Sequence, residues 1–200
     1  MKIIGLCGGS GSGKGMVSAL FAELGIPSID TDKIYKEITS YDSECMSSLI
    51  SEFGPSVAND DGSLNREEMR RLVFSSEGCA KRRQRLNDIT HKFVLDETKK
   101  RIEGYRINGK RAVIADVPLL FESGFDKICD IIIAVVADEA TRIERIVDRD
   151  GISEEQAKSR IAAQIPAYEL IKKSDFVIEN NGDVDELRTK VNELFSKLNL

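Results

Sequence analysis

The residues Gly8-Gly9-Ser10-Gly11-Ser12-Gly13-Lys14 follow the spacing GxxxxGK, which is typical of loops that bind nucleotide phosphates. An apolar run at residues 2–7 precedes them and predicts a buried strand, and helical periodicity follows from residue 16 to 24. Glycines let backbone N–H groups converge on a phosphate, the helix N-terminus adds partial positive charge, and Lys14 can reach the outer phosphates. An ordinary glycine-rich turn is the alternative, but strand, spacing and lysine together favour a phosphate loop.

The position after the lysine departs from this motif. A Ser or Thr hydroxyl normally holds Mg²⁺ there, whereas this chain has Gly15 followed by Met16. Both residues are still expected beside the nucleotide. Mg²⁺ would then be held by nucleotide oxygens, waters and a carboxylate from elsewhere in the chain.

A second candidate lies at Asp30-Thr31-Asp32, where a short predicted strand ends. We expect this strand to run beside the first strand and parallel to it, so that both carboxyl ends meet at the edge where ligands bind. Asp32 could there orient an attacking hydroxyl, accept its proton or help to hold Mg²⁺. Alternatively, either aspartate could cap a helix that starts at Lys33. We expect one to cap and Asp32 to be functional.

Two further sets of polar residues follow later strands. Asp116 ends the apolar run at 111–115 and is a candidate Mg²⁺ ligand. Arg142, Arg145 and Arg149 share one helix face, where three guanidinium groups repel one another unless anions lie nearby; a solvated face is the equal alternative. The acids at 138–139 are better explained as the start of that helix, where they could also pair with Arg142.

The order of these runs predicts an α/β fold with a parallel five-stranded sheet flanked by helices. Its strands are expected at 2–7, 27–30, 111–115, 130–136 and 176–178, with a closing helix at 183–197. We expect one domain, with its core at about 1–38, 110–150 and 174–200. Three helical stretches, at 42–53, 65–74 and 78–105, predict a helical insertion at about 39–109. A charged helical segment at about 151–173 contains Pro166.

Composition excludes several classes of protein. A net charge of -5 argues against a nucleic-acid partner, and no apolar run reaches the roughly 18 residues of a membrane span. Four separated cysteines and one histidine argue against structural zinc and favour reduced thiols in the cytoplasm. A guanine-binding NKxD sequence is absent, which disfavours a GTPase. The sequence leaves the oligomeric state open.

Beyond the phosphate loop, several segments resemble the dephospho-CoA kinase family over nearly the whole chain. The more specific ones are Asp-Gly-Ser-Leu-Asn-Arg at 61–66 and Pro-Leu-Leu-Phe-Glu at 118–122. The others are Ile-Asp-Thr-Asp at 29–32, His91, Arg-Ile-Val-Asp-Arg-Asp-Gly at 145–151, Arg-Ile-Ala-Ala-Gln at 160–164 and Val-Ile-Glu-Asn at 177–180.

The resemblance implies a P-loop kinase core, a helical CoA-binding region at 39–109 and a mobile lid at 151–173. It implies ATP-dependent phosphorylation of the ribose 3′-hydroxyl of dephospho-CoA, with Mg²⁺. Asp32 would be the general base and Lys14 the phosphate clamp, and Asn180 would lie at the nucleotide. Arg66 and His91 would contact the acceptor. Arg145 and Arg149 would reach the transferring phosphoryl group as the lid closes.

This sequence departs from the family at four places: Cys7 replaces a usual Thr, Gly15-Met16 replaces Ser-Thr, Lys92 replaces Pro, and Arg142 replaces a frequent Gln. Two of the four touch the nucleotide loop. A kinase for another nucleoside or nucleotide, or a nucleotide-binding regulatory protein with weakened catalysis, is therefore the alternative expectation.

Overall fold

The computed structural model describes residues 1–74 and 78–200, which form two compact units. The first unit combines residues 1–30 with 104–200, and the second spans 31–103. The helical insertion was expected to begin near residue 39, whereas the second unit begins at Thr31. The difference is one helix, which carries Asp32. In the described ranges no helix is both long and apolar enough to cross a membrane.

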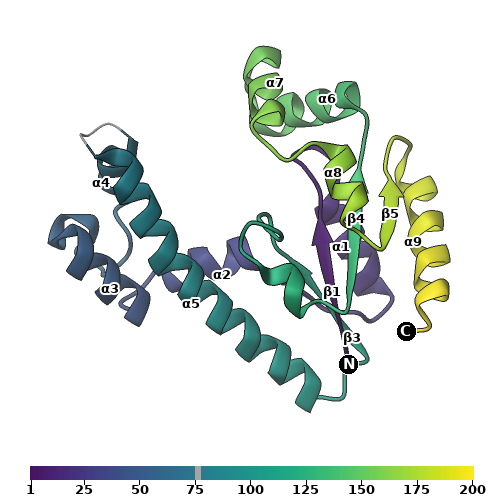
Figure 1. Cartoon of the computed structure of the whole chain (residues 1–200), viewed down its shortest axis with the longest axis horizontal. Helices are drawn as coiled ribbons and strands as arrows, with labels where there is room; N and C mark the ends of the chain where they lie inside the picture. Colours follow the sequence, from purple (N-terminus) through teal and green to yellow (C-terminus); the bar gives the residue numbers. More distant parts are fainter. Residues whose placement is uncertain (75–77) are drawn as a thin grey trace. The chain divides into compact units, whose positions relative to one another are not determined.

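The first unit is built on a sheet of five parallel strands (Figure 1). Its strands are β1 (Lys2–Cys7), β2 (Ser28–Asp30), β3 (Ala112–Asp116), β4 (Ile131–Val136) and β5 (Phe176–Glu179). β1, β3 and β4 are apolar runs, as expected for strands buried on both faces, whereas in the edge strands β2 and β5 only Ile29 and Ile178 are buried. All five strands predicted from the sequence are therefore present.

One expectation about the sheet was wrong. The strand order is β2-β3-β1-β4-β5, so β3 lies between β1 and β2 and the first two strands are not neighbours. The carboxyl ends of β1, β2 and β3 nevertheless share one edge, because all pairings are parallel: Leu6 and Asp30 both lie opposite Asp116. The inference about a shared edge needed only parallel strands, and it stands.

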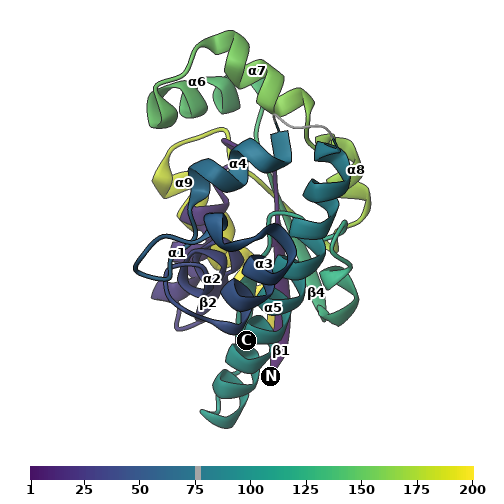
Figure 2. The same cartoon turned by 90° about the vertical axis from the view of Figure 1, so that its left-hand side faces the viewer.

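The two faces of the sheet are covered differently. Helices α1 (Lys14–Glu23) and α9 (Val184–Leu198) pack on one face, where Ile4, Leu6 and Phe21 belong to the main buried cluster. On the other face, Leu120 and Cys129 lie against Gly5. The 3₁₀ turn η2 (Phe125–Ile128) and α8 (Ala167–Lys172) belong to the same unit, as do α6 (Glu139–Asp150) and α7 (Glu154–Ala162). Figures 1 and 2 show α6 and α7 side by side.

The second unit is helical. It holds α2 (Thr31–Ile38), α3 (Glu44–Phe53), the 3₁₀ turn η1 (Pro55–Val57), α4 (Arg66–Phe74) and most of α5 (Cys79–Ile107). The three predicted helical stretches correspond to α3, α4 and α5. Helix α2 starts at Thr31 and not at Lys33, so Asp32 lies inside its first turn and Asp30 directly precedes it. An acid in a first turn stabilises the helix dipole.

Candidate active site

The phosphate loop, residues Gly8–Lys14, joins the end of β1 to the start of α1. Gly13 occupies the N-cap position with φ of 91°, a left-handed conformation that favours glycine. A Cβ at Gly13 would also collide with the Asn180 side-chain amide. Only glycine therefore fits at position 13. The loop that it closes leaves the N-terminus of α1 open to an anion.

The end of β5 braces the loop. Asn180 is 6% exposed, and its Nδ2 donates to the carbonyl oxygen of Ser12 at 2.9 Å. Its own backbone N–H donates to Val136 on β4 at 2.8 Å. The Ser12 hydroxyl is buried and has no hydrogen-bond partner among residues 1–74 and 78–200. Asn180 thus acts on the loop backbone, as a residue that fixes the loop's shape.

Three cations bond to carbonyl oxygens in and beside this loop. Lys14 Nζ donates to Gly8 at 3.0 Å, and Arg142 Nε donates to Ser10 at 2.8 Å. Arg145 Nη1 donates to Asn180 at 2.9 Å and to Gly11 at 3.3 Å. Among the described residues none of the three forms an ion pair with a carboxylate. Concentrated positive charge without acidic partners is what a polyphosphate site requires.

Arg149, the third arginine of the stripe, is arranged differently. It is exposed, and its Nε and Nη2 donate to the Asp150 carboxylate at 2.8 and 2.9 Å. Arg160 on α7 forms an ion pair with the same carboxylate. The arginine hydrogen bonds hold the pKa of Asp150 well below its usual range. In this structure Arg145 is at the loop, Arg149 bonds its neighbour within α6, and Arg160 joins α7 to α6 through Asp150.

The acids at 138–139 begin α6, as the simpler explanation predicted. Asp138 occupies the N-cap position and Glu139 the first turn. The expected ion pair with Arg142 is not formed, because the guanidinium turns to the phosphate loop instead.

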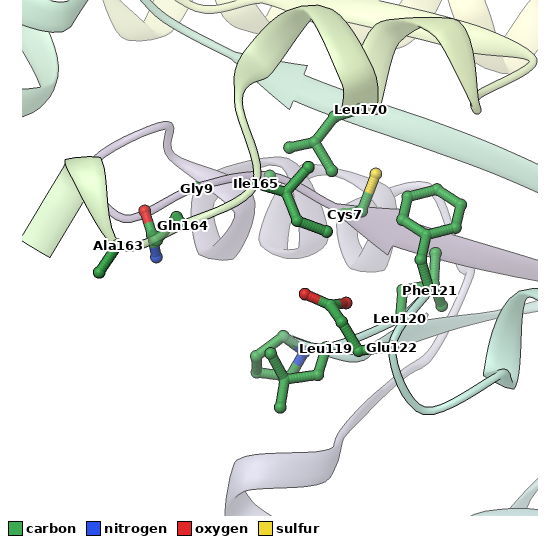
Figure 3. Close-up of a pocket in the computed structure, with 12 residues that line it drawn as sticks. Cys7, Gly9, Leu119, Leu120, Phe121, Glu122, Ala163, Gln164, Ile165 and Leu170 are labelled. Atoms are coloured by element: carbon green, nitrogen blue, oxygen red, sulfur yellow. The ribbon is translucent and has the colours of Figure 1, made fainter.

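A pocket of about 170 Å³ opens beside the loop within the first unit (Figure 3). The chain after β3 and the segment that joins α7 to α8 form its walls. Glu122 points its carboxylate into this space, and Cys7, Gln164 and Ile165 line it (Figure 3). Burial raises the pKa of the Cys7 thiol, whose Sγ lies 3.6 Å from the Ser174 hydroxyl. Cys7 therefore presents a neutral thiol at the end of β1.

Asp116 lies at the carboxyl edge of the sheet, level with Leu6 on β1 and Asp30 on β2. Mg²⁺ in kinase sites is held by one or two carboxylates together with phosphate oxygens and waters, and seldom by a full protein cage. In the described part of the chain, no cluster of three or more potential metal-ligating side chains occurs. One carboxylate beside a phosphate loop fits Mg²⁺ that arrives with a nucleotide.

Gly15, the second residue of α1, faces open space: a Cβ there would meet no atom within 4 Å. Met16 is 44% exposed. The absence of a hydroxyl at position 15 is therefore not forced by packing.

The second unit holds the remaining residues that the sequence singled out. Asp32 is exposed on α2, and Tyr35 lies one turn further along the same helix. The Arg66 guanidinium lies 5.8 Å from the centre of the Tyr35 ring and 3.5 Å from the Thr39 hydroxyl. His91 is half-buried on α5. Within this unit the structure brings Arg66 to the helix of Asp32.

Sequence reasoning gave no site role to Tyr35 or Gln164, and it left Arg142 open between a functional arginine face and a solvated one. Gln164 stands in the motif at 160–164, whereas Arg142 is one of the departures from the family. Gln164 contacts Arg142, which is 22 residues away, and Ser10, which is 154 residues away. Tyr35 has a local signal, since it follows Asp32 at helical spacing.

Comparison with known proteins gives one result. The family model for dephospho-CoA kinase matches residues 2–186. A dephospho-CoA kinase of Symbiobacterium thermophilum is 41% identical over 191 residues, covering 96% of this chain and 79% of that protein. One of Bacillus thuringiensis subsp. konkukian is 37% identical over 198 residues, covering 99% and 98%.

Solved structures agree on the fold. Dephospho-CoA kinase from Campylobacter jejuni superposes with a TM-score of 0.72 at 23% identity, covering 98% of this chain and 96% of that one. Shikimate kinase from Acinetobacter baumannii gives 0.55 at 19% identity, covering 100% and 96%. The fold is thus that of P-loop kinases, and ATP is the phosphoryl donor that such a family implies. With the phosphate loop and its cations in place, the chain belongs to the dephospho-CoA kinase family.

Proposed function

We propose that this protein transfers the γ-phosphoryl group of ATP to the ribose 3′-hydroxyl of dephospho-CoA, the last step of coenzyme A synthesis. The observation that carries the proposal is the phosphate loop. Lys14, Arg142 and Arg145 bond to its carbonyl oxygens or to the adjoining strand end, and within residues 1–74 and 78–200 they bond to no carboxylate. Membership of the family supplies the acceptor.

The loop residues Gly9–Met16 bind the ATP phosphates in this proposal. Backbone N–H groups and the N-terminus of α1 hold the inner phosphates, and Lys14 exchanges the Gly8 carbonyl for a phosphate oxygen. Asn180 keeps the loop in shape. Phosphoryl transfer needs little covalent work by the protein, so positioning and charge neutralisation should dominate.

Arg145 and Arg149 neutralise the transferring group. Arg145 is already bonded at the loop, whereas Arg149 would have to leave Asp150. We propose that residues 151–173 act as a lid, whose closure breaks that contact and excludes water from the site.

The acceptor side belongs to the helical unit. Asp32 is proposed as the general base that takes the proton of the attacking hydroxyl. It follows the last residue of β2 by two positions, which supports a place near the carboxyl edge of the sheet. Arg66 and His91 would bind the acceptor, within a CoA-binding region at about 39–109.

Mg²⁺ would neutralise charge on the ATP phosphates. Asp116 is the residue proposed to hold it, with Asp32 as a second carboxylate. A cytoplasmic location fits a chain with four free thiols, and no nucleic-acid or membrane partner is proposed.

The test is ATP-dependent conversion of dephospho-CoA to coenzyme A by the purified protein, followed by mass. Asp32→Asn should lower turnover by at least about 100-fold, as expected for loss of a general base, and leave ATP affinity nearly unchanged. ATP binding without transfer at any Mg²⁺ or Mn²⁺ concentration would instead support the weakened regulatory homologue that Gly15 suggests. A near-normal rate for the Asn variant would remove Asp32 from the role of base.

A further inference from the structure

Arg142 is a buried cation at the phosphate loop. It is 8% exposed, and burial lowers its pKa from the ordinary arginine value. Arginine side chains are seldom buried this deeply without an acidic partner. Among the described residues, Arg142 has no ion pair, and its two side-chain hydrogen bonds go to neutral oxygens. A cation held in this way lacks a counter-charge until an anion arrives.

Gln164 completes a three-way contact. Its Oε1 accepts from Arg142 Nη2 at 2.9 Å and from the Ser10 backbone N–H at 3.0 Å. Arg142 Nε donates to the carbonyl oxygen of Ser10 at 2.8 Å. Both backbone groups of Ser10 are therefore held, one by α6 and one by the α7–α8 linker (residues 163–166).

The neighbouring glycines are fitted to this contact. A Cβ at Gly9 would collide with the Arg142 guanidinium, and it would lie 3.0 Å from Gln164 Oε1. A Cβ at Gly11 would press on the backbone of Arg142 itself. The side chain of Arg142 thus occupies the space beside Gly9, and its main chain occupies the space beside Gly11.

We propose that Arg142 is a positioning residue of the nucleotide site, which fixes the phosphate loop at Ser10 and couples it through Gln164 to the α7–α8 linker. This rests on the proposed function in so far as ATP binds at the loop. The bound phosphates supply the negative charge that the guanidinium lacks. Through the Gln164 contact, a change in the position of Ser10 would also move the α7–α8 linker.

Glutamine is the frequent residue at this position in the family that the sequence resembles, so Arg142→Gln is an informative variant. It removes the positive charge, and a glutamine amide can replace at most part of the pair of hydrogen bonds that the guanidinium donates to Ser10 and Gln164. Arg142→Lys keeps the charge but not the planar fork. Gln164→Glu keeps an acceptor oxygen for Ser10 and gives Arg142 a counter-charge inside the protein. Arg188→Gln, at an exposed ion pair with Glu23, is the matched control for charge loss.

Direct titration with a non-hydrolysable ATP analogue, without acceptor, is the main measurement. We expect the dissociation constant to rise about tenfold for Arg142→Gln, as for loss of charge-assisted contacts, and severalfold for Arg142→Lys and for Gln164→Glu. The control should stay within about twofold of the wild type. The double variant Arg142→Gln/Gln164→Glu should show a non-additive effect, because the two side chains share one contact.

A purely structural role would lower the melting temperature of the variants while folded protein still bound the analogue normally. That result, or additive effects in the double variant, would overturn the inference. If the wild type binds the analogue but does not convert dephospho-CoA, the acceptor assignment is overturned. The dissociation constants of the Arg142 and Gln164 variants then still decide the present inference. A wild type that binds no nucleotide would overturn both.

Discussion

Substituting Gly15 by Ser tests how this chain handles Mg²⁺. The substitution restores the hydroxyl that a phosphate loop normally carries after its lysine. Nothing lies within 4 Å of a Cβ at position 15, so the new side chain meets no steric obstacle. Gly15 is the second residue of α1, directly after Lys14.

Gly15→Ser should also change the free energy of unfolding. Glycine costs about 1 kcal/mol relative to alanine inside a helix and serine about 0.5, so Gly15→Ser should stabilise the folded state by roughly 0.5 kcal/mol. For a chain of this length that raises the melting temperature by about 1–2 °C. Gly104→Ser is the matched control, because Gly104 is also helical and its Cβ would also meet open space.

The effect on metal use is separate. If the hydroxyl adds one ligand worth about 1.4 kcal/mol to bound Mg²⁺, the Mg²⁺ concentration for half-maximal rate falls about tenfold. The assay is the initial rate of ADP formation with dephospho-CoA over a Mg²⁺ titration at fixed ATP. Gly104→Ser should match the wild type in this titration.

A Gly15→Ser variant that gains the same stability as Gly104→Ser but keeps the wild-type Mg²⁺ dependence would contradict this expectation. In that case the metal is bound without any contribution from the first turn of α1.

Three other outcomes follow from contacts of the first and second units. Asn180→Ala leaves the Ser12 carbonyl without its buried donor, so unfolding by urea should show a loss of about 1–3 kcal/mol, with weaker ATP binding. Asp150→Asn removes the ion pair with Arg160 that joins α6 to α7, so hydrogen exchange should become faster in α7, and an unchanged rate would contradict this. Burial raises the pKa of Cys45 to about 11 and that of Cys129 to about 12 from 9.0. Because the unfolded thiols ionise first, this contribution to stability should be full below pH 9 and be lost as the pH rises from 9 through about 11 for Cys45 and about 12 for Cys129. Cys129→Ala should reduce the loss of stability between pH 7.5 and pH 10, measured by urea unfolding.

Local sequence determined most of the elements. Most strands contain an apolar run bounded by polar or turn residues, and the longer helices show helical periodicity, so the approximate positions of these elements could be predicted from the sequence. The phosphate loop could also be predicted, because the spacing of its glycines and Lys14 sets a backbone shape that needs no distant partner. The edge that carries Asp30 and Asp116 followed from parallel topology alone.

Pairing and side-chain contacts were decided only by the tertiary structure. Nothing in the first two strands indicates that β3 inserts between them, because any apolar parallel strand could pair at that edge. The spacing of Arg142, Arg145 and Arg149 gave one helix face, yet it could not say that the first bonds the loop while the last bonds Asp150. Helical periodicity fixes which residues share a face. The partner that this face meets depends on contacts between segments more than a hundred residues apart, which only the folded chain brings together.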